Sequence, residues 1–205
     1  LQRQGIEIAG AIEESAQLLE EARGYREITA WESELPQTLA VCNQVSQNFY
    51  AEMLLRTLGW KRKGRGTTEN GVAAVEEFLK EAGIEGVLQS DGSGLTKENR
   101  ATAQDLSTLL LHMLRHKHAA VFLESLAVSG DPRGTLKRRL NAPDLKGRVR
   151  AKTGHVAGVS TLSGYVSAAN GDTFVFSVLV NTDEGISASA GDLLQNRLCE
   201  ILARQ

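Results

Sequence analysis

The sequence has 205 residues, of which 41% are hydrophobic and 23% charged. That balance is typical of one globular domain, or of one compact part of a larger protein. The net charge of −2 gives no electrostatic footprint for nucleic acid or for an anionic membrane, and no apolar stretch is long enough to span a bilayer. The two cysteines, Cys42 and Cys199, form no disulfide framework, and we expect two free thiols.

The first 35 residues carry the weakest pattern. Ile6 and Ile8 before Gly10 suggest a short strand, and residues 24–33 suggest another. The sequence begins at Leu1 with neither an initiator methionine nor a signal-peptide pattern. We therefore expect a fragment in which residues 1–35 are the tail end of an inserted or upstream segment.

Helices are expected through the middle of the chain. One begins at Pro36, because proline suits the first turn of a helix. The next, over residues 46–58, is apolar on most sides, which predicts a buried helix that ends at Gly59. A third, amphipathic helix stops at Gly83. Residues 101–115 carry the cleanest helical stripe of leucines and methionine.

A basic run, Lys61–Arg65, lies between the second and third of these helices. It is consistent with a solvated surface turn, and also with a patch that meets an anionic polymer.

The spacing of polar and apolar residues changes from a helical to a two-residue period in the last third of the chain. Residues 148–153 alternate between basic and uncharged side chains, which predicts a strand with one polar face. Residues 159–167 and 173–180 read as two further strands, joined through Asn170-Gly171, a strong hairpin signal. The last helix presents an apolar face over residues 194–202. Together these elements predict an antiparallel sheet packed with helices, in the α+β or mixed α/β class.

Two short motifs carry chemistry. Ser46-Gln47-Asn48 fits Ser-x-Asn at a helix start, and Lys152-Thr153-Gly154 ends a strand that reads as a sheet edge. Each alone has an ordinary explanation, since Ser and Asn cap helices and Gly ends strands. In this order and context they are two of the three motifs of the serine β-lactamase and penicillin-binding superfamily.

Longer blocks narrow the resemblance. Residues 36–205 resemble the C-terminal part of the D-alanyl-D-alanine carboxypeptidase/endopeptidase family, the low-molecular-mass class C penicillin-binding proteins (serine peptidase family S13). The blocks that carry the resemblance are Ser46–Arg56, Asp91–Leu95 with Glu98–Arg100, Gly134–Arg139, Val149–Gly154, Gly158-Val159 and Leu162–Tyr165. The resemblance implies a partial transpeptidase-like fold for residues 36–205.

The third motif of the superfamily, Ser-x-x-Lys, is absent from the sequence. No serine from Ser15 to Ser189 is followed three residues later by lysine. In the family that motif lies far upstream, so we expect the nucleophile segment to be missing from this fragment. The fragment alone is then expected to be inactive and to leave part of its core unfilled.

The resemblance implies catalytic roles for three residues. Ser46 would relay a proton to the departing amine. Asn48 would hold the peptide substrate and contact the upstream lysine. Lys152 would supply positive charge beside the serines. The sequence departs from the family at Gln44, where the family more often has lysine.

The resemblance also implies substrate-binding roles. Thr153 would hydrogen-bond the terminal carboxylate of the substrate, and Gly154 would let the substrate backbone approach the strand. His155 would contribute its backbone N–H to the oxyanion hole. No metal and no other cofactor is expected.

The function implied is that of a serine-type D-Ala-D-Ala carboxypeptidase, with or without D,D-endopeptidase activity, working through an acyl-enzyme. Its expected substrates are peptidoglycan stem peptides ending in D-Ala-D-Ala, its inhibitors β-lactams, and its location the periplasm or cell envelope. The missing N-terminal half of the same protein is also an expected partner. Binding to nucleic acid is not expected. One alternative is a non-catalytic homologue that binds a muropeptide or a protein; another is a β-lactamase.

Overall fold

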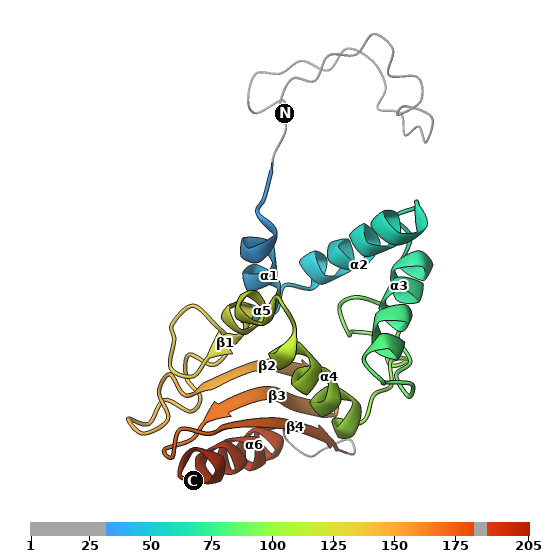
Figure 1. Ribbon diagram of the computed structural model, residues 1–205. Coiled ribbons are helices and arrows are strands. Elements are labelled where there is room, and N and C mark those ends of the chain that lie inside the picture. Colours follow the sequence, from blue (N-terminus) through green and yellow to red (C-terminus); the bar gives the residue numbers. More distant parts are fainter. Residues whose placement is uncertain (1–31, 183–187) are drawn as a thin grey trace, which may run out of the picture. The chain divides into compact units, whose positions relative to one another are not determined.

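The computed structural model describes residues 32–182 and 188–205, and the description is confined to the unit that begins at Ser33. The strands expected before Pro36 fall almost wholly on residues 1–31, outside the described part. The described elements are α1 (Leu35–Gln44), α2 (Asn48–Lys63), α3 (Thr68–Glu81), α4 (Ala103–Arg115), α5 (Ala119–Ser125), β1 (Ala127–Val128), β2 (Val149–Val156), β3 (Val159–Ser167), β4 (Thr173–Asn181) and α6 (Ala188–Ala203) (Figure 1).

The four strands form one antiparallel sheet in the order β1-β2-β3-β4. β2 and β3 are joined by a two-residue turn in which Gly158 has a φ of 77°. The connection from β3 to β4 contains Asn170 and Gly171, and Gly171 has a φ of 94° that favours glycine. The predicted antiparallel sheet, the hairpin through Asn170-Gly171 and the mixed helix and sheet class are therefore confirmed.

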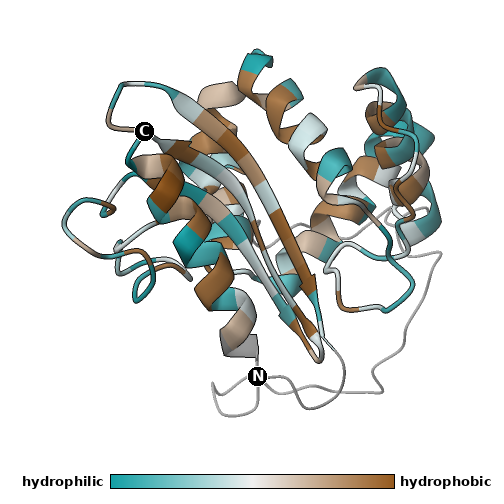
Figure 2. Ribbon diagram, turned by 90° about the horizontal axis from the view of Figure 1, so that it is seen from below, coloured by the Kyte–Doolittle hydropathy of each residue, from teal (hydrophilic) through white to brown (hydrophobic). Residues whose placement is uncertain are grey.

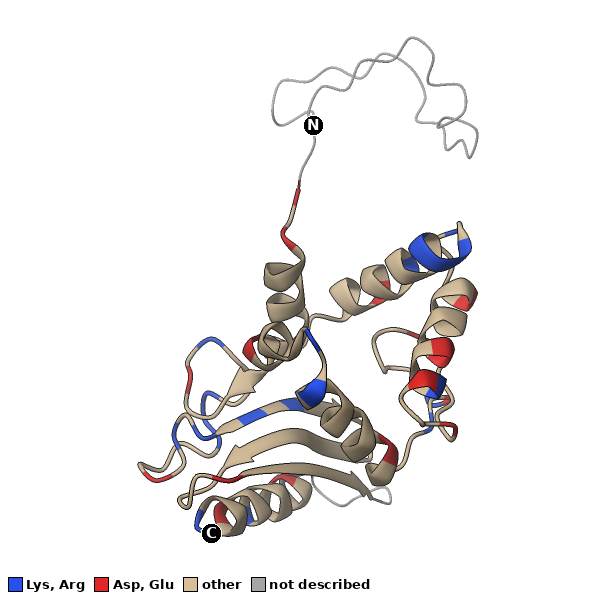
Figure 3. Cartoon of the chain, viewed as in Figure 1, with Lys and Arg blue, Asp and Glu red and all other residues tan. Residues whose placement is uncertain are grey.

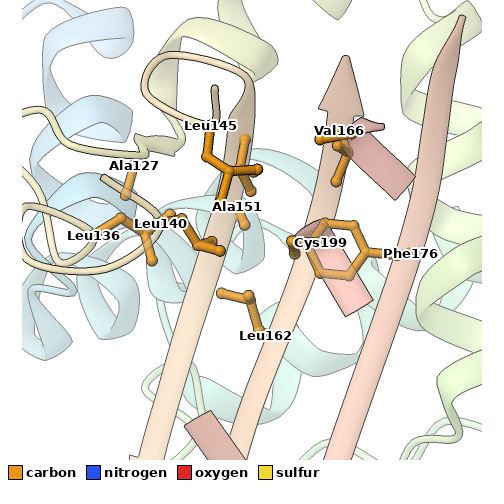
Figure 4. Close-up of a cluster of buried hydrophobic side chains, with 11 residues drawn as sticks. Ala127, Leu136, Leu140, Leu145, Ala151, Leu162, Val166, Phe176 and Cys199 are labelled. Atoms are coloured by element: carbon orange, nitrogen blue, oxygen red, sulfur yellow. The ribbon is translucent and has the colours of Figure 1, made fainter. Parts of the chain in front are cut away.

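The sheet is covered on both faces, as Figure 1 shows. On one face, residues of β2, β3 and β4 pack against α6 in a core that contains Leu162, Val166, Phe176 and Cys199 (Figure 4). On the other face, Tyr165 packs against α4 and donates a hydrogen bond to the Leu110 carbonyl at 2.8 Å. Because side chains alternate along a strand, β3 serves both cores. Figure 2 shows the brown, hydrophobic positions of α6 and the strands.

The predicted alternation of β2 is confirmed. Val149, Ala151 and Thr153 are buried, whereas Arg150 and Lys152 are only half-buried. Figure 3 shows the basic positions along this strand.

The prediction that this strand forms a sheet edge needs correction. β2 lies between β1 and β3, but β1 is only two residues long and pairs only with Arg150 and Ala151. From Lys152 onward, β2 is paired in the described part of the chain with β3 alone. The strand as a whole is therefore interior, and the half that carries the Lys-Thr-Gly motif still has an open side.

The helices that surround this sheet have identifiable caps. α3 begins after Thr67, whose hydroxyl accepts from the Asn70 N–H, and α4 begins with a capping box between Thr102 and Asp105. Gly83, with a φ of 75°, follows the end of α3 as predicted. The α1 helix, in which proline occupies the first turn, is also confirmed.

The second predicted helix differs in three ways. α2 begins at Asn48 rather than Ser46, and it runs through Gly59 to Lys63. Gly59 does not end the helix but lets α3 pack closely, because a Cβ there would lie 2.7 Å from the Gly71 nitrogen. Gly64, with a φ of 78°, ends the helix instead.

The expectation that this helix is buried is also wrong for the described chain. Within α2 only Leu55 and Gly59 are buried, while Phe49 is 66% exposed and Trp60 is 55% exposed. Apolar composition all round a helix predicts burial only when partners exist on every side. In the unit described here α2 packs mainly on α3, so its other faces stay open.

Both cysteines are free thiols, as predicted, although Cys42 is only partly buried. The basic run Lys61–Arg65 is exposed and lies at the end of α2, where its charges suit the negative end of the helix dipole (Figure 3). No helix among the described residues is both long and apolar enough to cross a bilayer.

Candidate functional site

The two sequence motifs meet at one hydrogen bond. Lys152 Nζ of β2 donates to Ser46 Oγ at 2.7 Å, although the two residues lie far apart in the chain. The sequence suggested that Ser46 opens a helix. In the structure Ser46 instead occupies the turn between α1 and α2. The turn places its hydroxyl toward the half of β2 with the open side.

Ser46 has a left-handed backbone conformation. Its φ is 58°, a backbone angle that residues other than glycine, asparagine and aspartate rarely adopt. Such a conformation costs about 1–3 kcal/mol and is common at functional sites. Leu140 has a similar φ of 53°, so the conformation alone assigns no role, and the case for Ser46 rests on its contact with Lys152.

Lys152 is held by two acceptors. Besides Ser46 Oγ, its ammonium donates to the Thr153 carbonyl at 2.6 Å. Burial lowers the pKa of Lys152 below its ordinary value, and Cys42 opposes that shift. A desolvated ammonium attracts an anion more strongly than one in water, so this group is suited to bind a carboxylate.

Cys42 was not among the predicted site residues. Burial raises the pKa of its thiol, and the nearby positive charge of Lys152 opposes that effect. Cys42 lies in the last turn of α1, shortly before Ser46, but Ser46 is outside the helix, so helical spacing could not have placed the thiol near Lys152.

Thr135 was also missed. The Thr153 hydroxyl donates to Thr135 Oγ1 at 2.9 Å, and the Thr135 N–H donates to the Gln44 carbonyl at 2.8 Å. Thr135 belongs to the block Gly134–Arg139 that resembles the family, so a signal was present, but only the fold brings it to β2.

Gln44, where the family more often has lysine, points away from this site. Its side chain donates to the Glu124 carbonyl of α5 at 2.9 Å, and the neighbouring Asn43 donates to Ser125 Oγ at 2.8 Å. The two side-chain contacts dock α1 on α5, whereas the Gln44 carbonyl faces the site and accepts from the Thr135 N–H.

The hydrogen-bond ladder fixes the direction of the His155 backbone. The Ser167 N–H donates to the Arg148 carbonyl, so the pair 148/167 is hydrogen-bonded, and bonded pairs recur at every second residue. Even-numbered residues of β2 thus face β3. Odd-numbered residues face away, as shown by Val149, whose carbonyl accepts from Ser129 of the β1 side. The N–H of His155 therefore points to the open side of β2.

The structure gives a reason for glycine at position 154 that the sequence did not reveal. A Cβ at this position would lie 2.4 Å from Thr161 Oγ1 on the adjacent strand. An alanine here would force the Thr161 hydroxyl to move, so the neighbouring strand already favours glycine at this position. Its suggested role in admitting substrate backbone stays a prediction.

Asn48 is the one predicted catalytic residue that the described contacts do not bring to Lys152. It is exposed at the first position of α2, two residues after Ser46. Its contact with an upstream lysine stays a prediction.

The Asp91–Leu95 loop is anchored on the same helix. Glu52 of α2 accepts from the backbone N–H groups of Gly92 and Ser93 at 3.1 and 2.9 Å. Hydrogen bonding from Ser93 lowers the pKa of Glu52. The Ser93 hydroxyl donates to Asp91 at 3.2 Å, within the same loop.

Comparison with known proteins identifies the family. The profile of the D-Ala-D-Ala carboxypeptidase 3 (S13) family matches residues 1–205. A D-alanyl-D-alanine carboxypeptidase from an Actinomadura species is 37% identical over 180 residues, which cover 84% of this chain and 33% of that protein. The chain thus spans about a third of the length of the relatives that it matches.

Solved structures share the fold. Penicillin binding protein 4 (dacB) from Haemophilus influenzae, in a complex with a β-lactam, matches with a TM-score of 0.74 and 26% identity over 83% of this chain and 42% of that chain. A β-lactamase from Sphaerobacter thermophilus matches with a TM-score of 0.62 over 83% of this chain and 62% of that chain, and at 19% identity it is evidence for the fold alone. The predicted partial penicillin-binding protein and β-lactamase-like fold is thereby confirmed.

Proposed function

The chain belongs to the D-Ala-D-Ala carboxypeptidase 3 (S13) family, and from that premise we propose that it is the C-terminal part of a serine-type D-Ala-D-Ala carboxypeptidase. The proposed enzyme cleaves peptidoglycan stem peptides through an acyl-enzyme, outside the cytoplasmic membrane, with or without endopeptidase activity. The hydrogen bond between Lys152 and Ser46 carries the proposal, because it joins the two motifs into one polar site.

The nucleophile of this reaction is a serine of an upstream Ser-x-x-Lys segment. Its oxygen attacks the carbonyl carbon between the two D-alanines, and its proton passes to the upstream lysine. The C–N bond then breaks and D-alanine leaves with a proton. Ser46 is suited to deliver that proton, because Lys152 donates to its oxygen and leaves the Ser46 hydrogen free to point elsewhere.

The terminal carboxylate of the substrate fits beside Lys152. An ammonium has three N–H donors, and the contacts with Ser46 and Thr153 use two of them. The third, together with the Thr153 hydroxyl, can meet a carboxylate. Thr135 supports this role, since a hydroxyl that accepts from Thr153 can reverse and donate to it when Thr153 turns to the substrate.

The substrate carbonyl fits at the open side of β2. There the N–H of His155 can bind the developing oxyanion, together with the N–H of the upstream serine. Loss of one such donor typically costs about 2.7–4 kcal/mol of transition-state stabilisation. The side chain of His155 need not contact the substrate in this step.

β-Lactams are the proposed inhibitors, because they acylate the same serine and carry a carboxylate for Lys152. Support comes from the β-lactam complex of the Haemophilus influenzae protein. The non-catalytic alternative is disfavoured because Ser-x-Asn and Lys-Thr-Gly are both intact and are joined by the bond between Lys152 and Ser46, whereas a module that only binds has no need of a proton relay.

Labelling with a fluorescent penicillin tests the proposal. We expect a covalent adduct on the full-length gene product, on a serine upstream of Leu1 when mapped by mass spectrometry, and no adduct on residues 1–205 alone. A folded full-length protein that takes no label would overturn the proposal and favour the binding-protein reading. Rapid release of hydrolysed penicillin would favour a β-lactamase.

The variant Ser46→Gly isolates the hydroxyl. Glycine accepts the φ of 58° without strain, so thermal stability should stay within about 1 kcal/mol of the wild type or rise. Turnover of a D-Ala-D-Ala peptide should fall by about 10²–10⁴-fold, the usual contribution of a positioned proton-transfer group. Ser90→Gly, on an exposed serine outside the site, is the matched control and should keep its turnover.

A further inference from the structure

A polar cluster ties the end of β2 to the start of α6. One oxygen of Asp192, Oδ1, is approached by Arg139 Nη1 at 3.1 Å, Ser160 Oγ at 3.0 Å and His155 Nε2 at 3.1 Å. The three partners come from the loop before β2, from β3 and from β2, whereas Asp192 itself belongs to α6. His155 is also the residue whose backbone N–H faces the open side of its strand.

The cluster contains serine, histidine and aspartate but is no hydrolytic triad. A triad needs the two ring nitrogens of histidine to serve different partners. Here the same nitrogen, His155 Nε2, faces both Asp192 Oδ1 and Ser160 Oγ, the latter at 3.3 Å. Ser160 is moreover buried and donates its own proton to Asp192.

The hydrogen-bond partners assign the histidine proton. A carboxylate can only accept, and the Ser160 hydrogen is already directed to it. Ser160 Oγ in turn accepts from Gln195 Nε2 at 3.1 Å. The nitrogen Nε2 of His155 therefore carries a hydrogen and donates to Asp192, which leaves Nδ1 outside this contact.

Asp192 is itself held firmly. Arg139 donates to Asn196 Oδ1 through Nε and Nη2, at 3.1 and 2.9 Å, and to Gln195 Oε1 at 2.9 Å. The guanidinium thus binds three residues of α6 in its fixed fork. The carboxylate that accepts from His155 is thus one of three groups on α6 that Arg139 binds.

The close approach of α6 to β3 also depends on glycine. A Cβ on Gly191 would lie 2.8 Å from Ser160 Cβ. The first part of α6 thus packs directly on β3, opposite His155 in the register of the sheet, where His155 pairs with Ser160.

We propose that the His155 side chain and Asp192 are positioning residues for the oxyanion donor, an inference that rests on the function proposed above. From Lys152 to Val156 the strand is paired in the described part of the chain only with β3, so its open side has no backbone partner to hold it. The ladder with β3 sets the direction of the His155 N–H, and the contact between His155 and Asp192 adds a second anchor that limits its displacement. A misplacement of about 1 Å in such a site can cost on the order of 10²-fold in rate.

The test uses the full-length protein and separates binding of penicillin from acylation in rapid-mixing experiments. His155→Ala keeps the backbone N–H but removes the tie, and its acylation rate constant should fall on the order of 10- to 100-fold. The dissociation constant for the initial, non-covalent complex should change less than about 3-fold, because Lys152 and Thr153 still hold the carboxylate.

His155→Gln is the decisive companion variant. The Gln side-chain nitrogen can occupy the place of Nε2 and donate to Asp192, so most of the lost rate should return. Asp192→Asn, which keeps an acceptor oxygen at nearly the same volume, should lose less than His155→Ala. His118→Ala, on an exposed histidine away from the site, is the control for a generic loss of histidine.

Two results would overturn the inference. One is a His155→Ala protein that acylates at the wild-type rate. The other is a His155→Gln protein as slow as His155→Ala with an equally lowered melting temperature, since that pattern belongs to a residue that only supports folding. Failure of the wild-type protein to react with penicillin at all would instead refute the proposed function, and is therefore distinguishable.

Discussion

The sheet with its covering helices and the helices α1–α3 differ in how they treat apolar side chains. In the sheet region, Leu162, Val166 and Cys199 are fully buried between the strands and α6. In the helical region, Phe49, Leu58 and Trp60 of α2 remain exposed. The sheet region completes its core with residues of this chain, whereas α2 buries one face only. The described part of the chain thus combines a closed core around the sheet with a helix whose apolar side chains are largely exposed.

The sharpest test of this difference compares two large-to-small changes. Leu162→Ala removes a side chain that is 0% exposed and should lower the free energy of unfolding of the isolated chain by about 2–5 kcal/mol. Phe49→Ala removes a side chain that is 66% exposed and should change it by no more than about 0.5 kcal/mol. Urea denaturation followed by circular dichroism measures both. Equal losses would show that the two regions are not different in this way.

The exposed face of α2 also predicts association of the isolated chain. Contiguous exposed apolar surface is a common site of protein contact, and here we expect self-association or binding to the N-terminal part of the same protein. Light scattering should show species larger than a monomer, and Phe49→Ser should reduce them. A monodisperse monomer over a wide concentration range would contradict the expectation.

The contact between α2 and α3 should respond to one added methyl group. A Cβ on Gly71 would lie 2.3 Å from the Leu55 carbonyl oxygen, so Gly71→Ala should cost about 1–3 kcal/mol despite the better helix propensity of alanine. Gly86→Ala is the matched control, because the nearest atom, at 3.6 Å, belongs to the Asp105 side chain. Thermal unfolding of both variants checks the difference. A neutral Gly71→Ala would mean that α3 moves freely on α2.

The Asp91 loop supplies a pH-dependent test within the helical region. Burial alone would raise the pKa of Asp91, but hydrogen bonds from Asn99, Thr96 and other loop groups outweigh it and lower the pKa below its ordinary value. The unfolded chain then binds the proton more readily, so the stabilisation is complete above the ordinary carboxyl pKa. It is lost as pH falls through the lowered folded value.

Asp91→Asn should therefore reduce stability at neutral pH by about 1–2 kcal/mol, since hydrogen bonds to a charged acceptor are lost. The difference from the wild type should shrink as pH falls below the ordinary carboxyl range. Melting temperatures measured between neutral and acid pH provide the check. A constant difference across that range would show that the charge of Asp91 does not contribute.

Local sequence was enough for elements whose signals are local. The alternation over residues 148–153, the Asn170-Gly171 turn and Gly83 after α3 all appear where the pattern placed them, because each depends on neighbouring residues. The end of α2 was not predicted correctly. Gly59 does not interrupt the helix but allows the close approach of α3, a contact that sequence spacing does not reveal.

The sequence by itself determined the residue types of the two motifs and their order, because Ser-x-Asn and Lys-Thr-Gly are each three consecutive residues. Only the tertiary structure decided which groups meet. It turned Ser46 to a positive φ under Lys152, brought Thr135 to Thr153, and joined His155 to Asp192 of the last helix. Such contacts depend on how the chain packs across the sheet. They join residues that are distant in sequence, so no local sequence pattern predicts them.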